Sequence, residues 1–450
     1  MDSLKQWILG LAVFCGLLLG AGLSTAGVEG IVGTVSGNHH TFDLEARTGY
    51  ITTGEGNSVY MWGYADALNT PSASMQYPGP TLIVTEGDLV TINLANYLPV
   101  DTSIVFPGQN VSVTSSDQAG LITGQAPAPV KDGPVWIIGT ATYEFTASKP
   151  GTYTYYSGTD TGLQVEMGLL GAIIVRPAAN SNWAYGHANT AFDYEYLYIL
   201  SEIDDIIHDA VEADPTAAVD MTTRDSKYWL INGRTGPDTL FPSGVPYLPN
   251  QPYSAFSQTL PGKDVLVRVV GGGLDLHPFH THGQNFRILA RDGRMRSSSP
   301  TSGADVGMSD FTLSVAPGQT YDAIWNWTGA GLGWDIYDST TVHTCLGFTI
   351  ETGTPGDFDP VTHEFCPDHG KPIPVDLPQN QFMAFGGFWT GSPFLGSEDE
   401  LPVGEGGNNP TGGFYFMWHS HNEKELVNFD IAPGGMLTMM AVEPPGTPIQ

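Results

Sequence analysis

The feature that most limits the fold of this chain is an internal repeat. Residues 87–94 (GDLVTINL) lead to residues 102–109 (TSIVFPGQ), and residues 262–269 (GKDVLVRV) lead to residues 277–284 (HPFHTHGQ). The Gly-Gln pair that ends both copies sets their register. Alternation of apolar and polar residues predicts half-buried strands, and the repeat predicts two copies of one structural unit.

The ends of the two units match as well. Residues 151–158 (GTYTYYSG) and then 168–175 (GLLGAIIV) correspond to residues 413–421 (GFYFMWHSH) and then 434–441 (GGMLTMMA). With 56 Gly and 33 Pro among 450 residues, the composition favours strands joined by turns. We therefore predict an all-β chain that forms two β-sandwich domains.

The repeat also predicts the domain boundaries. The first sandwich covers residues 28–177, and the second covers residues 178–445 with a long, Gly/Pro-rich loop insertion at about 339–413. Loops of this length are usually functional or independently folded. A short helix is expected near residues 203–212, with His208 on its surface.

The N-terminal residues 1–26 have Lys5 before an apolar run and small residues at its end, which is typical of a secretory signal peptide. A retained membrane anchor is the alternative, because the run is nearly long enough to span a bilayer. Cleavage would give a secreted, periplasmic or extracellular protein without a membrane segment. In that oxidising compartment Cys345 and Cys366 are expected to form a disulfide bond, and metal ligation by them is the alternative. The net charge of −31 argues against nucleic acid as a partner.

Two pairs of histidines carry the chemistry that the sequence predicts. Alternate side chains of a strand share a face, so His280 shares a face with His282, and His419 shares a face with His421. Two such strands side by side would direct four imidazoles to one point. Imidazole is the commonest protein ligand for copper and zinc, so the doubled pair predicts a metal site.

These motifs resemble those of the multicopper oxidases, whose cupredoxin domains are Greek-key β-sandwiches. The resemblance covers most of the chain and implies two cupredoxin-like domains, with copper rather than zinc as the cofactor. It also implies that His277 serves a separate blue-copper site. The motifs that carry the resemblance are residues 77–81 (YPGPT), 167–171 (MGLLG), 277–283 (HPFHTHG) and 418–421 (WHSH).

The chain departs from the family at residues that bind copper. Ser420 stands where the family has the blue-copper cysteine, and Glu425 stands where it has the second blue-copper histidine. A serine hydroxyl lacks the soft thiolate character that such sites use. The remaining imidazoles could hold one copper well or two poorly, and three are not expected. The first-domain histidines are replaced by Val105, Pro107, Tyr156 and Gly158.

We therefore expect an oxidoreductase with a mononuclear or dinuclear copper site, a small-molecule or metal-ion electron donor, and dioxygen as the second substrate. Tyr156 and Glu425 are candidate catalytic residues, and the alternatives are a core tyrosine and a solvated loop. Non-catalytic binding or sequestration of copper or zinc is an alternative function, as is a structural cell-surface role. The resemblance also implies a homotrimer as one expected assembly. The expected metal ligands are His280, His282, His419 and His421, with His277 at the separate site.

Overall fold

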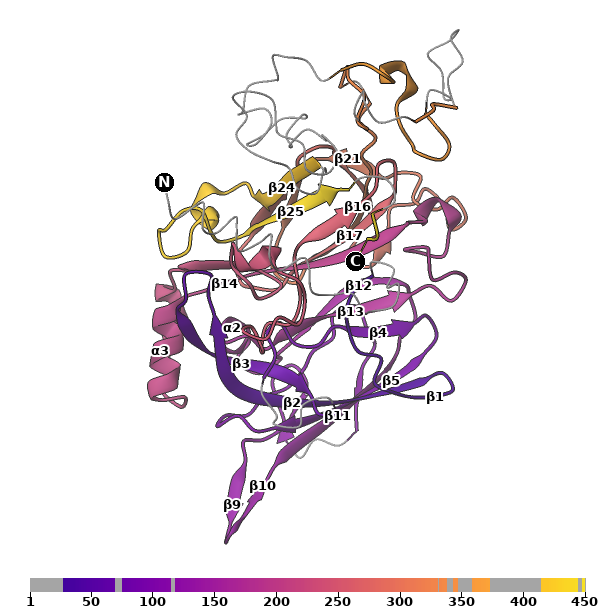
Figure 1. The fold of residues 1–450 in the computed structure, drawn as a ribbon. Coiled ribbons are helices and arrows are strands. Elements are labelled where there is room, and N and C mark those ends of the chain that lie inside the picture. The colour runs from indigo at the N-terminus through magenta and orange to yellow at the C-terminus, as the bar shows by residue number, and fades with distance from the viewer. Residues whose placement is uncertain are drawn as a thin grey trace.

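Strands that alternate in polarity form most of the described structure, as the sequence predicts. The computed structural model describes residues 27–68, 75–114, 118–330, 332–337, 343–346, 358–372, 414–443 and 447–449. The expected signal peptide and most of the expected insertion lie outside these residues. Two β-sandwiches are stacked end to end, the first in indigo to magenta and the second in pink to yellow (Figure 1).

The first sandwich packs a sheet of order β1-β2-β5-β11-β6, with β3 beside β2, against a smaller sheet of order β12-β13-β4. Its core includes Trp62, Tyr155 and Ile173. The hairpin formed by β9 and β10 projects from the far end of this sandwich (Figure 1). The strands are β1 (Thr34–Ser36), β2 (His39–Thr52), β3 (Ser58–Asp66), β4 (Leu82–Thr85), β5 (Leu89–Asn96), β6 (Ser112–Val113), β7 (Gln118–Ala119), β8 (Gly124–Gln125), β9 (Val130–Asp132), β10 (Val135–Ile137), β11 (Gly139–Thr146), β12 (Gly151–Tyr156) and β13 (Leu170–Arg176).

The second sandwich packs a sheet of order β15-β14-β17-β23-β19-β20, with β21 beside β19, against a sheet of order β16-β25-β24-β18-β22. Phe279, Trp325 and Trp418 lie in its core. The strands are β14 (Tyr194–Ile203), β15 (Tyr228–Ile231), β16 (Ser257–Thr259), β17 (Val265–Gly271), β18 (His277–His280), β19 (Phe286–Arg291), β20 (Arg294–Met295), β21 (Met308–Asp310), β22 (Thr312–Val315), β23 (Thr320–Trp325), β24 (Phe414–Ser420) and β25 (Leu437–Val442).

Helices are few and short. Helix α3 (Asp205–Ala213) lies at the position expected from the sequence, while α2 (Thr161–Glu166) precedes β13. No helix in the described ranges has the length and apolar character needed to cross a bilayer. The 3₁₀ helices are η1 (Ala188–Thr190), η2 (Met221–Thr223), η3 (Asp238–Leu240), η4 (Cys366–Asp368) and η5 (Glu423–Leu426).

The predicted repeat is confirmed by strand pairing. In the first sandwich β2 runs parallel to β5 and β5 antiparallel to β11, and β14, β17 and β23 repeat this arrangement in the second. In the facing sheets, the parallel pair β4 and β13 corresponds to β16 and β25. The Gly-Gln signatures also match, since Gly108 has φ 85° and Gly283 has φ 84°. This left-handed conformation favours glycine and explains why both copies retain it.

One expectation for residues 180–223 is wrong, and one strand there was not identified from the sequence. Residues 180–223 include β14, a central strand of the second sandwich that sequence reasoning did not identify. His208 is completely buried rather than on the surface. Its Nδ1 lies 2.5 Å from the carbonyl oxygen of Tyr60 and its Nε2 lies 3.6 Å from Glu166, so the histidine attaches α3 to the first sandwich. The expected disulfide bond between Cys345 and Cys366 is present.

Buried charges and apolar contacts connect the two sandwiches. Arg268 on β17 is completely buried and donates hydrogen bonds to Glu195 (2.7 Å) and Asp322 (3.0 Å). Asp322 also accepts a 2.5 Å hydrogen bond from the hydroxyl of Thr152 on β12. Because one partner comes from the first sandwich, this network fixes the two units relative to each other.

Candidate metal centre

Strand pairing brings the two histidine motifs together. β18 lies between β22 and β24 in one sheet, and His280 is the direct cross-strand partner of His419. Because these strands are antiparallel, His282 and His421 lie on opposite sides of this pair, and the backbone amide of His421 donates to the carbonyl oxygen of Pro278 at 2.7 Å. The two motifs therefore meet as expected for histidine-bearing strands packed side by side, with His282 and His419 separated by 137 residues in the chain.

Three imidazoles form the inner part of this cluster. His280, His282 and His419 each offer a ring nitrogen, and these nitrogens all lie within 4.8 Å of one another. The three residues are only 5%, 1% and 6% exposed. Nε2 of His282 lies 3.1 Å from Nε2 of His419. Two nitrogens that bind one tetrahedral metal ion at about 2.0–2.1 Å are themselves roughly 3.3 Å apart, so this spacing fits a shared ion.

Neighbouring groups orient two of the rings. Nδ1 of His280 lies 2.9 Å from the hydroxyl of Thr312 on β22, and Nδ1 of His419 donates to the carbonyl oxygen of Ser420 at 2.6 Å. With Nδ1 engaged, each ring presents Nε2 to the cluster, which is the arrangement that metal-binding histidines use. Nδ1 of His282 is buried and has no hydrogen-bond partner within the described residues.

The electrostatic environment keeps these imidazoles neutral at pH 7. Burial, followed by the neighbouring His419 and His421, lowers the pKa of His280 to about 4. Burial and the adjacent His419 and His280 lower the pKa of His282 to about 3, and burial also lowers the pKa of His419. A neutral ring is the form that binds a metal ion.

His421 occupies the outer edge of the cluster. Its side chain is exposed, and its ring centroid lies 4.7 Å from that of His280. Its ring is outside the group of three whose nitrogens lie within 4.8 Å of one another. The structure therefore divides the four predicted ligands into three buried imidazoles and one at the solvent boundary.

His277 is in a different environment. Its Nε2 lies 2.8 Å from Glu202 and its Nδ1 lies 2.9 Å from Glu425, and all three residues are buried. An imidazole can donate to two carboxylates only when both nitrogens carry a proton, so His277 is an imidazolium. Burial alone would lower the pKa of His277, but the hydrogen bonds to these two carboxylates outweigh this effect and raise it to about 9. Both ring nitrogens of His277, the residue expected to serve a blue-copper site, are thus engaged with carboxylates.

The chain supports the carboxylate of Glu202 with further contacts. Glu202 accepts hydrogen bonds from the backbone amides of Leu274 and Asp275 at 2.6 and 2.9 Å, and it forms an ion pair with Arg224. A Cβ atom on Gly273 would lie 2.0 Å from Glu202 Oε2, so the close approach requires glycine at this position. Sequence reasoning missed Glu202 because this residue lies on β14, a strand that the sequence analysis did not identify.

The other expected catalytic candidate, Tyr156, lies apart from the cluster. It is half-buried and packs against an apolar group between the two sandwiches that includes Tyr77, Leu170 and Ile199. Glu425 is buried against His277 rather than in a solvated loop. Neither side chain contacts the inner imidazoles in the described structure, so their catalytic roles stay predictions.

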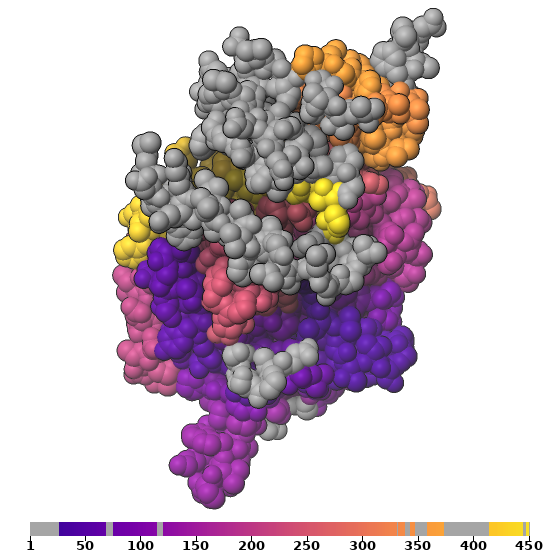
Figure 2. All heavy atoms as spheres, viewed as in Figure 1, coloured from indigo at the N-terminus to yellow at the C-terminus, as the bar shows by residue number. Residues whose placement is uncertain are grey.

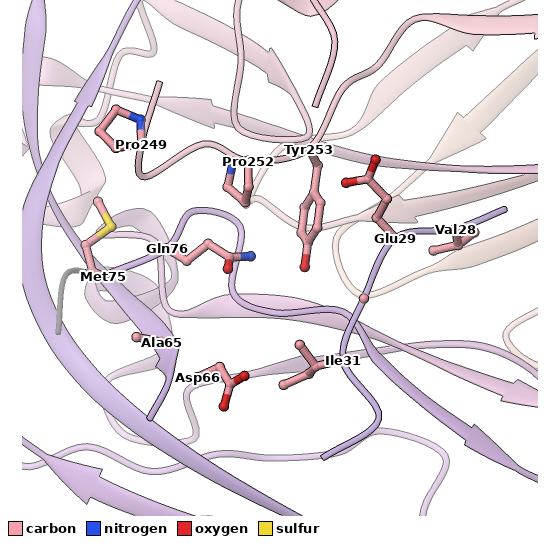
Figure 3. A pocket seen from close by; sticks show the side chains of 11 residues that line it. Val28, Glu29, Ile31, Ala65, Asp66, Met75, Gln76, Pro249, Pro252 and Tyr253 are labelled. Atoms are coloured by element: carbon pink, nitrogen blue, oxygen red, sulfur yellow. The ribbon is translucent and has the colours of Figure 1, made fainter. Parts of the chain in front are cut away.

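Two further features lie outside this cluster. A pocket of about 560 Å³ between Glu29, Asp66 and Tyr253 contains no histidine in its lining (Figure 3). A second group of possible ligands comprises Asp335, just before the expected insertion, and His343, Glu364 and His369 within it. The histidines flank the cysteines in sequence, but the two carboxylates carry no recognisable spacing signal.

Comparison with known proteins gives a consistent result. Residues 67–180 and 212–326 each match a sequence model described as multicopper oxidase. Laccase-8 of Oryza sativa subsp. japonica is 25% identical over 334 residues, which are 71% of this chain and 52% of that protein. Copper resistance protein A of Escherichia coli is 25% identical over 341 residues, which are 67% of this chain and 51% of that protein.

Similarity extends to solved structures. The blue copper oxidase from Nitrosomonas europaea superposes with a TM-score of 0.52 at 18% identity, over 89% of this chain and 85% of that one. This likeness shows the cupredoxin-type fold. The chain spans about half the length, or less, of the curated relatives it matches. With two matching family regions on a repeated cupredoxin-like sandwich, the chain belongs to the multicopper oxidase family.

Proposed function

We propose that this protein is a secreted copper-binding oxidoreductase with a reduced site of one or two copper ions. The observation that carries the proposal is the cluster of three buried, neutral imidazoles whose ligand atoms lie within 4.8 Å of one another. These three imidazoles match copper in ligand type. Copper, when bound, supplies one-electron redox chemistry.

The residues of the chain define what such a site would do. His280, His282 and His419 would hold the ion, while Thr312 and the Ser420 carbonyl fix two of the rings. His421, at the exposed edge, would complete the ligand set or border the path for a small-molecule or metal-ion donor and dioxygen. Burial excludes water from the inner side of the site and keeps the rings unprotonated.

The position of His277 favours a site without blue copper. Glu202 and Glu425 engage both nitrogens of His277, and Ser420 provides no thiolate. We propose that the protein exchanges electrons directly at the histidine cluster. The replacement of the blue-copper ligands supports a second candidate function, non-catalytic binding or sequestration of copper or zinc, because it removes the family's route for electrons.

We further propose domains at residues 28–177 and 178–445, a periplasmic or extracellular location after removal of residues 1–26, and a homotrimer as the assembly. The family resemblance implies sites between subunits, and the exposed position of His421 would suit a ligand from a neighbouring copy. Sedimentation of the mature protein would test the assembly.

Copper titration with parallel oxygen-consumption measurements tests the function. The expected result is saturation at one or two equivalents, no intense blue absorption from thiolate-bound copper, and oxygen uptake with phenolic or ferrous donors. Three or four bound coppers with a blue band would contradict the reduced site. Copper binding without turnover of any donor would establish sequestration instead.

A further inference from the structure

A second cluster of side chains that could hold a metal ion, separate from the histidine cluster, is formed by the insertion together with Asp335 just before it. Two carboxylates and two imidazoles offer ligand atoms that all lie within 4.8 Å of one another. They come from the orange segment that stands at the end of the molecule opposite the β9–β10 hairpin (Figures 1 and 2). The four residues are Asp335, His343, Glu364 and His369.

Each imidazole of this cluster lies between the two carboxylates. Nε2 of His343 is 2.8 Å from Glu364 Oε2 and 3.5 Å from Asp335 Oδ2. Nδ1 of His369 is 2.9 Å from Glu364 Oε1 and 3.7 Å from Asp335 Oδ2. The two rings are edge to face, with centroids 4.6 Å apart. The four groups therefore surround one point from different directions.

The buried negative charge of this cluster favours the binding of a cation. The side chains of Asp335 and Glu364 are each only 1% exposed. Within the described residues, the basic groups that lie within 4.0 Å of these carboxylates are the two imidazoles. Burying two neighbouring carboxylates is costly unless positive charge compensates them. A divalent ion would neutralise both and leave the imidazoles as neutral ligands.

The ligands are held in place by the surrounding chain. Asp335 accepts backbone hydrogen bonds from Tyr337 at 2.9 Å and Gly370 at 2.7 Å, which fixes its carboxylate without help from the histidines. The disulfide between Cys345 and Cys366 joins the segments that carry the other ligands. His343 and Glu364 each precede one of these cysteines by two residues, and His369 follows Cys366 by three. The cluster is thus assembled by covalent and backbone constraints.

We propose that Asp335, His343, Glu364 and His369 bind one divalent transition-metal ion of the zinc type, as a structural centre of the insertion. Two nitrogen and two oxygen ligands suit zinc, whereas magnesium and calcium prefer oxygen alone. Four protein ligands leave no open position, as in structural rather than catalytic zinc sites. The proposal is independent of the copper function, since it shares no residue with the histidine cluster.

Zinc titration of the full mature chain tests this site. A background variant with His282→Ala and His419→Ala removes two of the three inner imidazoles of the other cluster, so that tightly bound, stoichiometric zinc must bind elsewhere. We expect one equivalent of zinc in this background. Adding Asp335→Asn and Glu364→Gln is expected to weaken zinc binding by at least about 100-fold, because even outer-shell losses cost about 10–100-fold.

A matched control and a milder variant keep the test decisive. His363→Asn changes a histidine of the same segment outside the cluster, and Asn tolerates the positive φ of that residue, so zinc binding should be unchanged. His369→Gln removes the most exposed ligand and should weaken zinc binding if the double variant does not fold. Zinc should also slow proteolysis within residues 343–372. No zinc in the background variant, or undiminished binding after His369→Gln, would overturn the proposal.

Discussion

Equivalent positions of the two sandwiches carry different chemistry on one backbone arrangement. Val105 pairs with Tyr156 through reciprocal backbone hydrogen bonds of 2.8 and 3.2 Å, as His280 pairs with His419 in the second sandwich. Gly158 faces Val105, just as His421 lies against His280. The strand pairing therefore persists without imidazoles, which indicates that the histidines serve chemistry rather than the fold.

A second pair of equivalent positions differs in charge. In the first sandwich the hydroxyl groups of Thr102 and Ser157 donate to the side-chain oxygen of Gln164 at 2.8 and 2.6 Å. In the second sandwich, His277 takes the place of Thr102 and binds two carboxylates. Neutral hydrogen bonds have thus been exchanged for buried charges, which are much more costly to separate.

The largest expected effect tests this difference in charge. His277→Gln would leave Glu202 and Glu425 without their shared cation, so the free energy of unfolding should fall by about 3 kcal/mol or more. Thr102→Val removes one neutral hydrogen bond and should cost about 1 kcal/mol. Urea denaturation of both metal-free variants at pH 7 measures the contrast. Equal losses would show that the charged triad has no special weight.

The histidines of the second sandwich should make the stability of the protein depend on pH. The pKa of His277 is raised to about 9, above its ordinary 6.5, so its contribution is complete below pH 6.5 and is lost as pH rises through 9. The loss should approach about 3 kcal/mol. The lowered pKa values of His280 and His282, about 4 and 3, predict a separate loss as pH falls from 6.5 toward those values. Denaturation curves of the metal-free protein across this range measure both limbs, and His277→Gln should flatten the alkaline one.

The matched pair His419→Ala and Tyr156→Phe tests which sandwich binds copper. Loss of the His419 imidazole should weaken copper binding at least about 100-fold, because this ring is an inner ligand in the proposed site. Tyr156→Phe should leave copper affinity and donor oxidation unchanged, since Tyr156 packs in an apolar group between the sandwiches. Copper titration and oxygen uptake measure both. A loss of turnover with Tyr156→Phe would restore this residue as a catalytic candidate.

The smallest effects are expected at Gly158 and His421, which occupy equivalent positions of the two sandwiches. A Cβ atom on Gly158 would lie 2.7 Å from Val105 Cγ1, so Gly158→Ala should lower the free energy of unfolding by about 1–3 kcal/mol. His421→Ala, at the exposed equivalent position, should change it by less than about 0.5 kcal/mol in the metal-free protein. Thermal or urea unfolding of the two variants would distinguish them, and a neutral Gly158→Ala would mean that the first sandwich relaxes easily.

The sequence contained most of the fold because the repeat constrains both halves at once. Strand alternation identified β5 and β17, and the shared Gly-Gln gave the register that aligns Val105 with His280. The approach of His280 to His419 was expected from two His-x-His strands packing side by side. Sequence alone did not identify β14, whose residues follow no marked turn signal and lie in a segment with helical character.

The environment of each site depends on contacts that no local pattern reveals. Glu202 reaches His277 across 75 residues, and Asp335 comes within 4.8 Å of Glu364, which lies in an insertion with no periodic signal. His208 has a helical neighbourhood in sequence, yet α3 packs it against Tyr60. Such pairings depend on tertiary packing, which a single sequence does not specify.

The buried triad around His277 has a consequence for protein engineering. Ser420→Cys alone would not recreate a blue-copper centre, because the neighbouring imidazolium remains bound to Glu202 and Glu425. Replacing only one glutamate would leave the buried imidazolium of His277 with a single carboxylate partner, which disturbs the charge balance where water is excluded. Recovery of the centre thus requires coordinated changes at several positions. Each variant that carries only some of these changes is expected to be less stable.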